Sequence, residues 1–200
     1  MIIPERRILE TEKVVLRPVV EEDYEEFYQL AQDDEEAWKY FTLRLADKDH
    51  LRKWMDAAFA DRNNGTRRPF TIIEKSSGKI AGSSSMGNIS YFDLRLEIGW
   101  SWLGKNFRGS GINLHAKFSM MNHAFEQLQF ERVEFKTDWL NERAKQGLRK
   151  VGGKEEGVLR SHMTMWNNRR RDSIYFSVLK NEWPELKQTI FKGVKGYEFH

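Results

Sequence analysis

Two glycines two residues apart, Gly109 and Gly111, are the residues whose type and spacing point most directly to chemistry. They lie in the stretch Asn106-Phe107-Arg108-Gly109-Ser110-Gly111-Ile112-Asn113, where a strand pattern gives way to a helix pattern. Glycine lets the backbone approach a phosphate without a Cβ in the way, and the first turn of a helix offers unpaired N–H groups to an anion. The stretch therefore predicts either a phosphate-binding loop or a simple tight turn between strand and helix.

The residues on either side of this loop indicate the strand and the helix that position it. Upstream, apolar residues alternate with polar or small ones, as in a half-buried strand: Leu94, Leu96, Ile98, Trp100 and Trp102. Downstream, apolar residues recur at helical spacing on one face: Leu114, Phe118, Met121, Phe125 and Leu128.

The same periodicities divide the rest of the chain into short elements. Strands are expected at 14–17, 70–74, 79–89, 132–136, 155–166 and 171–179, and helices at 21–32, 49–61 and 141–151. Residues 35–45 look irregular, and Trp183-Pro184 opens a last helix or turn. The order is β-α-α-β-β-β-α-β-α-β-β, with a three-strand meander before the loop and an α/β alternation after it.

This order predicts an α/β (α+β) fold with a mixed, mostly antiparallel central sheet flanked by helices. We expect a single domain over residues 1–200, with its core at about 10–185. A dinucleotide-binding domain is disfavoured, since such domains begin with βαβ units and place the glycine turn early. A P-loop NTPase is also disfavoured, because no Lys-Ser/Thr follows the glycines.

Composition excludes several classes of site. The chain contains no cysteine, so a disulfide, a thiolate nucleophile and Cys-ligated zinc are ruled out. The five histidines have no metal-ligand spacing, and His115 and His123, eight apart on the expected helix, are predicted to be surface or partner contacts. No segment is apolar over a length that could cross a bilayer, which predicts a soluble, cytoplasmic protein.

The charge pattern is that of a solvated surface with both signs mixed. The net charge is only +3 although 32% of the residues are charged, so a nucleic-acid partner is not expected. The clusters Arg67-Arg68 and Arg169-Arg170-Arg171 stand beside turn residues, which predicts exposed loop and hairpin tips. Contact of the second cluster with RNA or a ribosome is a weaker alternative.

Taken with these elements, the motifs resemble the GNAT superfamily of acetyl-CoA-dependent N-acetyltransferases. Within it, the chain is similar to the branch of bacterial ribosomal-protein N-terminal acetyltransferases. The superfamily's pyrophosphate loop reads Arg/Gln-x-x-Gly-x-Gly/Ala; here both glycines match and Asn106 takes the first position. Leu96-Glu97-Ile98-Gly99-Trp100 resembles the branch's Glu-Ile-Gly-aromatic strand. Partial matches follow in the same order: Ala124-Phe125 with Arg132-Val133, Asn141-Glu142-Arg143-Ala144, residues 151–157, and Arg171-Asp172-Ser173 with Glu182-Trp183-Pro184.

The resemblance implies the GNAT fold and acetyl transfer from acetyl-CoA to a primary amine, either a protein N-terminus or a small molecule. We expect no metal cofactor and no membrane partner, and the protein could form a homodimer. The strand before the loop would splay from strand 132–136 and leave room for the pantetheine arm. The expected cofactor-binding residues are Trp100, Ser101, Trp102, Phe107, Arg108, Gly109, Ser110, Gly111, Ile112, Asn113 and Asn141.

Several of these roles have a structural alternative. Arg108 would contact a phosphate or face solvent, and Asn141 would bond the CoA arm, cap its helix, or do both. The expected catalytic residues are Asn141 and Glu97; Glu97 is the candidate base, and its alternative role is that of a cross-strand partner for Arg95 or another arginine.

The remaining chemical steps have weaker candidates. A backbone N–H near Trp100 or Ser101 would meet the oxyanion. Ala144 and Gly153 occupy positions where the family often has the general acid, and Tyr175 is a remote substitute for it. A non-catalytic CoA-binding or partner-binding protein on the same fold is therefore the alternative function.

Overall fold

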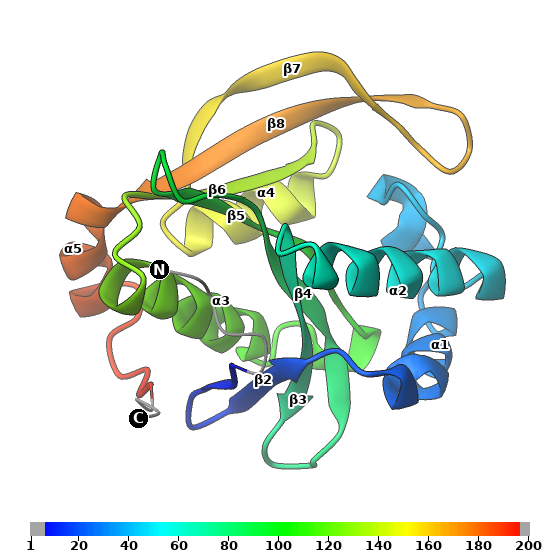
Figure 1. Cartoon of the computed structure of the whole chain (residues 1–200), viewed down its shortest axis with the longest axis horizontal. Coiled ribbons are helices and arrows are strands. Elements are labelled where there is room, and N and C mark those ends of the chain that lie inside the picture. The colour runs from blue at the N-terminus through cyan, green and yellow to red at the C-terminus, as the bar shows by residue number, and fades with distance from the viewer. Residues whose placement is uncertain (1–6, 197–200) are drawn as a thin grey trace.

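Residues 7–196 are described in the computed structural model, and an eight-stranded sheet runs through them (Figure 1). Its order is β1-β2-β3-β4-β5-β6-β8-β7. The strands are β1 (Leu9–Glu10), β2 (Val14–Pro18), β3 (Arg67–Glu74), β4 (Ile80–Ser90), β5 (Arg95–Leu103), β6 (Arg132–Asp138), β7 (Lys154–Thr164) and β8 (Arg170–Leu179). All neighbouring pairs are antiparallel except β5 and β6, which run parallel. The predicted mixed, mostly antiparallel sheet is confirmed.

Helices cover both faces of the sheet and give it two hydrophobic cores. They are α1 (Tyr24–Gln32), α2 (Lys48–Asn63), α3 (Ile112–Asn122), α4 (Glu142–Lys150) and α5 (Trp183–Gln188), with a 3-10 turn at Glu35–Tyr40 in the segment expected to be irregular. One core packs α1 and α2 with that turn, around Phe27, Trp38, Trp54 and Trp102. The other packs α3 and the C-terminal residues against Leu96, Ile98 and Phe135. Figure 1 shows α1 and α2 on one side and α3 and α5 on the other.

A buried carboxylate joins α1 to the sheet. Asp23 accepts hydrogen bonds from Arg17 Nη1 and Nη2 on β2 at 2.8 and 2.5 Å, and from Thr71 Oγ1 on β3 at 2.6 Å. The backbone N–H of Val20 donates to the same carboxylate at 3.0 Å. Burial acts to raise the pKa of Asp23, but the bonds from Arg17, Thr71 and Val20 outweigh it and hold the pKa below its ordinary value. This group therefore stays ionised although its side chain is buried.

Strand β5 separates from β6 halfway along its length. The parallel ladder joins Arg95 to Arg132, Leu96 to Val133 and Glu97 to Glu134, and ends there. Beyond it, the pairing of β5 with β4 becomes irregular and Trp100 takes a φ of 51°, a left-handed conformation that non-glycine residues adopt rarely. The local bulge bends β5 away from β6. A splay therefore opens between the two strands, as the resemblance implied.

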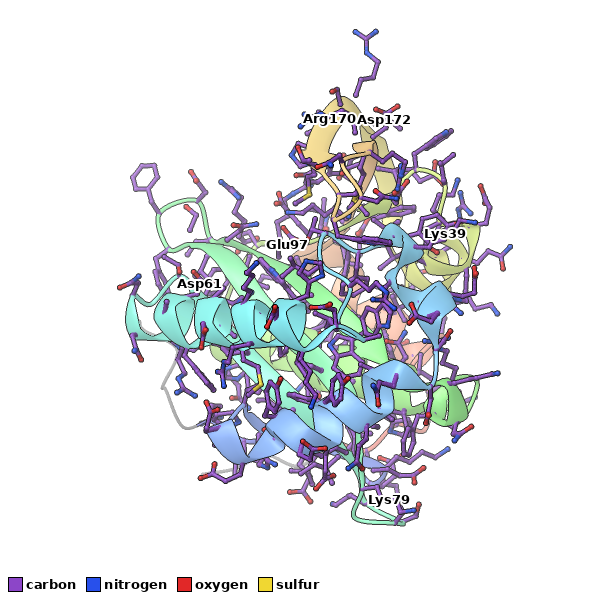
Figure 2. The ribbon with its side chains drawn as sticks, turned by 90° about the vertical axis from the view of Figure 1, so that its right-hand side faces the viewer. Lys39, Asp61, Lys79, Glu97, Arg170 and Asp172 are labelled. Carbon is purple, nitrogen blue, oxygen red and sulfur yellow. The ribbon has the colours of Figure 1, made fainter. Side chains whose placement is uncertain are left out.

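The β7–β8 hairpin contacts the 3-10 turn Glu35–Tyr40. The indole N–H of Trp166 donates to the Trp38 carbonyl at 3.0 Å, and Arg171 Nη1 donates to the Tyr40 carbonyl at 3.5 Å. In Figure 2, Glu97 lies between α2 and this hairpin, which carries the labelled Arg170 and Asp172. The hairpin and the turn therefore form walls on the Glu97 side of the sheet.

The prediction that the arginine clusters lie at exposed tips is wrong for three of the residues. Arg67, Arg68 and Arg171 are buried. Strand β3 begins three residues earlier than expected, so Arg67 and Arg68 belong to the strand and not to the turn before it. Arg171 lies on β8 under the 3-10 turn. Strands and turns that are distant in the sequence pack over these side chains. Turn residues next to them in the sequence therefore do not indicate whether they are buried.

His115 and His123 are also buried, contrary to the predicted surface role. His115 Nδ1 lies 3.1 Å from Thr11 Oγ1, and His123 Nδ1 lies 2.7 Å from Gln127 Oε1. Burial lowers the pKa of His123 to about 4, so its ring is neutral at pH 7. Helix α3 is enclosed by more than its apolar stripe because β1, β2 and the C-terminal residues pack against it.

Candidate active site

The glycine loop has the backbone geometry that its sequence predicted. Gly109 has a φ of 75° and Gly111 a φ of 90°, and α3 begins at the next residue, Ile112. A Cβ at Gly109 would meet no atom within 4 Å, so open space lies beside the loop. No side chain caps the helix at Gly111, which leaves N–H groups of the first turn available to an anion. Glycine is needed here for conformation, and the result is an exposed helix N-terminus.

Three basic side chains surround this loop. Lys13 Nζ lies 3.4 Å from the point where a Cβ of Gly111 would stand. Arg108 donates from Nε and Nη2 to the Leu103 carbonyl at 3.1 and 2.9 Å and forms an ion pair with Asp34. Burial, and then the nearby charge of Arg143 on α4, lower the pKa of Arg108. Arg108 is thus anchored to β5 rather than free in solvent, and the loop region carries an excess of positive charge.

Glu97 is buried where β5 and β6 begin to separate. Its Oε2 accepts hydrogen bonds from Asn88 Nδ2 on β4 and from Lys136 Nζ on β6, both at 2.7 Å. A Cβ at Gly99 would stand 2.6 Å from its other oxygen, Oε1, so glycine leaves room for the carboxylate. Arg95, the partner considered from the sequence, pairs instead with Asp93 and Glu134. The carboxylate does have a cross-strand cation, but it is a lysine.

Lys136 links Glu97 to a group of aromatic and titratable side chains. Its Nζ lies 5.8 Å from the Trp100 ring centroid and 5.9 Å from that of Tyr175. The Tyr175 ring is in turn 5.8 Å from that of His162 on β7. Burial raises the pKa of Tyr175, and burial, followed by the charge of Lys136, lowers that of His162. Lys136 therefore contacts both Glu97 and Tyr175, the remote candidate for the general acid, and His162 was not predicted as a site residue.

The three expected residues of β5 after the bulge have different environments. Trp100 packs against Gly87 and under the guanidinium of Arg67, whose Cζ is 4.9 Å from the ring centroid. Ser101 is half-buried at the splay. Trp102 places its side chain in the aromatic core with Phe27, so only its backbone is left to contact a cofactor.

Asn141 occupies the N-cap of α4. Its Oδ1 accepts a hydrogen bond from the Ala144 N–H at 3.1 Å, and its own N–H donates to the Asp138 carbonyl at 2.9 Å. The capping role considered from the sequence is therefore present. The side-chain amide still has donor capacity for a second partner.

Lys117 was not among the predicted site residues, although it lies beside Ser101. Its Nζ is 2.7 Å from Ser101 Oγ and 3.5 Å from Ser84 Oγ, and its side chain is buried. Burial, opposed by the charge of Glu97, lowers the pKa of Lys117 to about 7. The sequence did contain a signal that could have identified Lys117. It lies three residues after Leu114 and four before Met121, so it places a charge on the apolar face of the helix.

Comparison with known proteins places this chain in a family. A family model described as an acetyltransferase (GNAT) domain matches residues 13–154. The chain therefore belongs to the GNAT family of acetyltransferases. Within residues 7–196, no helix is long and apolar enough to cross a membrane, and no three His, Cys, Asp or Glu side chains are placed to hold a metal ion.

Individual proteins similar to this chain include one named as a ribosomal N-acetyltransferase. A Bacillus subtilis (strain 168) protein named "Putative ribosomal N-acetyltransferase YdaF" is 33% identical over 106 residues, which span 53% of this chain and 57% of that relative. A GCN5-related N-acetyltransferase from Brucella melitensis superposes with a TM-score of 0.85 at 29% identity, over 94% of this chain and 85% of that one. RimJ of Mycobacterium smegmatis, solved with CoA-disulfide, has the same fold, with a TM-score of 0.76, 22% identity and 95% of each chain covered.

Proposed function

We propose that this protein transfers the acetyl group of acetyl-CoA to a primary amine by direct attack within a ternary complex. The observation that carries the proposal is the alignment of two features on one strand: β5 splays from β6 directly after Glu97, and it leads into the glycine loop at the N-terminus of α3. A diphosphate at the loop and an acyl thioester at the splay would then be parts of one ligand.

The residues at the loop suit the diphosphate of CoA. The N–H groups that begin α3 and the positive end of its dipole would hold the phosphates, with Lys13 and Arg143 supplying charge. Arg108 would act mainly by fixing the loop to β5 through Leu103. The side-chain amide of Asn141 would bond the pantetheine arm while its carbonyl caps α4.

The residues at the splay suit transfer to an amine. Glu97 would take the proton of the attacking amine, directly or through a water molecule, and its hydrogen bonds with Asn88 and Lys136 hold the carboxylate in place at the splay. The strained backbone at Trp100 would present an N–H to the oxyanion. The acceptor would approach from the side of the sheet covered by the β7–β8 hairpin. A protein N-terminus and a small amine are both candidates, and the relative named as a ribosomal N-acetyltransferase supports the first.

A non-catalytic CoA-binding protein is the second candidate. It is favoured by Gly153, where a Cβ would stand only 2.9 Å from the Leu148 carbonyl oxygen, so the backbone leaves no room there for a side chain that could act as an acid. An assay of CoA release across N-terminal peptides, polyamines, amino acids and aminoglycosides separates the two. Binding of acetyl-CoA without release of CoA to any of these amines would support the second candidate.

Replacing Gly109 by glutamate is expected to weaken acetyl-CoA binding by at least about 10-fold, because it adds a negative charge beside the phosphates. Isothermal titration of the variant and the parent measures the change. Gly65→Glu is the matched control, since Gly65 has nearly the same backbone (φ of 74° against 75°) and equally open surroundings, but lies in the turn after α2. Equal loss of affinity in both variants would mean that the loop does not hold the phosphates.

A further inference from the structure

A buried lysine without a carboxylate partner lies at the base of the splay. Lys117 is 4% exposed, and among the described residues no carboxylate stands within ion-pair distance of its ammonium group. Its Nζ donates to Ser101 Oγ at 2.7 Å, Ser101 Oγ is 2.7 Å from Ser84 Oγ, and the Phe135 ring centroid is 5.6 Å away. A buried ammonium group costs folding free energy that an apolar side chain of the same length would not. Packing by itself gives no reason for a lysine here.

The ammonium group lies between the two strands where they part. The last pair of the β5–β6 ladder is Glu97 with Glu134. Ser101 lies beyond it on β5, and Phe135 is the next residue after it on β6. Lys117 reaches this point from α3, on the face opposite the α1–α2 core. Ser101 is half-buried while Lys117 is buried, so Ser101 is the more accessible of the two residues. Its hydroxyl donates a 3.3 Å hydrogen bond to the Gly99 carbonyl, and a ligand in the splay would take the place of that acceptor.

We propose that Ser101 donates its hydroxyl proton to the departing thiolate of the acyl donor, and that Lys117 replaces that proton. This inference rests on the proposed function, and it supplies the acid that Ala144 and Gly153 do not. As the carbon–sulfur bond breaks, its electron pair goes to sulfur, which takes the Ser101 proton. Ser101 takes a proton from Lys117 Nζ and leaves a neutral amine. Lys117 is thus a positioning residue acting through Ser101, and solvent returns its proton when the product departs.

The electrostatic surroundings of Lys117 suit this role. Ser84 from β4, Ser101 from β5 and Phe135 from β6 face the ammonium group, and within residues 7–196 Glu97 is the charged group whose field reaches it. With a pKa of about 7, Lys117 is a stronger acid than a thiol, whose ordinary pKa is about 8.5. Proton transfer from Lys117 to a thiolate is therefore downhill, and about half of the Lys117 side chains carry the proton at pH 7.

Lys117→Met is the direct test, because methionine fills nearly the same volume without a charge. We expect kcat to fall about 10- to 100-fold, the dissociation constant for CoA to stay within about twofold, and the melting temperature to stay equal or rise. The parent requires Lys117 protonated, so its kcat should decline as pH rises through 7, and the variant should lose that decline. Ser101→Ala should give the same loss of kcat, and the double variant should lose no more than either single one.

Ser119→Ala is the control on the same helix, since Ser119 is buried but bonds the Ala116 carbonyl, outside this network. It should leave kcat within about twofold. Unchanged kcat and pH profile in Lys117→Met would overturn the proposal. So would a loss of kcat that comes with weaker CoA binding and a lower melting temperature, since that is a structural effect.

A second readout needs no turnover. The titration of Lys117 in the CoA complex, followed by NMR of its ε-methylene group, should fall near pH 7 and below the titration of the bound CoA thiol, followed by the ultraviolet absorbance of its thiolate. A pKa of Lys117 above that of the bound thiol would overturn the inference even if acetyl transfer is observed. Failure of the parent to bind CoA would instead overturn the proposed function.

Discussion

Replacing Glu97 by glutamine is expected to lower kcat for acetyl transfer by about 100- to 10,000-fold, the range that a positioned general base contributes. Glutamine keeps the size of the side chain and can still accept from Asn88, but it cannot take a proton from the amine. Binding of acetyl-CoA should change little, because the glycine loop lies at the other end of β5. Release of CoA at saturating amine, with the dissociation constant measured separately, tests this.

The same substitution removes the carboxylate that pairs with the half-buried Lys136, so a loss of stability must be separated from a loss of chemistry. The double variant Glu97→Gln/Lys136→Met should recover melting temperature but not kcat. Glu134→Gln is the control: Glu134 faces Glu97 in the β5–β6 ladder and pairs with Arg95 and Arg132. It should keep kcat within a few-fold of the parent. Full activity in Glu97→Gln would leave Glu97 with the role of a cross-strand partner alone.

Replacing Asp23 by asparagine is expected to lower the free energy of unfolding by about 3 kcal/mol, the low end for breaking a buried ion pair, because Arg17 is partly exposed. The variant loses the paired charge that joins β2, β3 and α1 through Arg17 and Thr71. Denaturant unfolding at pH 7 measures the loss. Asp56→Asn is the control, since Asp56 forms an exposed pair with Arg52 on α2, and it should change the free energy by less than about 1 kcal/mol.

The same carboxylate predicts a pH dependence of stability. Because the folded protein lowers the pKa of Asp23 below 3.8, the stability it contributes is fully present above that value and is lost as pH falls through the folded pKa. The parent should therefore lose more stability than Asp23→Asn between pH 5 and more acidic solutions. Parallel curves for the two proteins would show that the carboxylate is not stabilised by folding.

Local patterns in the sequence determine most of the secondary structure here. Alternation over residues 94–102 and helical spacing from Leu114 to Phe125 depend only on neighbours, so β5 and α3 lie where they were expected. The glycine loop between them was also predictable, since a positive φ at Gly109 and Gly111 is a property of the residue type. The same holds for Asn141 as the N-cap of α4.

Partners from distant sequence decided what these local patterns could not. Trp102 belongs to the regular alternation of β5, yet the bulge at Trp100 and the helices α1 and α2 place its side chain in the aromatic core. Arg67 and Arg171 look like turn residues in sequence, and they are buried because Trp100 and the 3-10 turn at 35–40 pack over them. Burial depends on which elements cover a residue, and nothing within a few residues along the chain encodes that.

The candidate site shows the same division between sequence and tertiary structure. The sequence by itself determined a glycine loop after a strand that carries Glu97. Only the tertiary structure decided that Glu97 is paired with Lys136 from the next strand, and that Lys117 from α3 reaches Ser101. The physical reason is that a carboxylate or an ammonium group takes its chemical character from burial and from charges a few ångströms away. In this fold those neighbours come from other strands and helices, 16 residues away in the chain for Lys117 and Ser101 and 39 for Lys136 and Glu97.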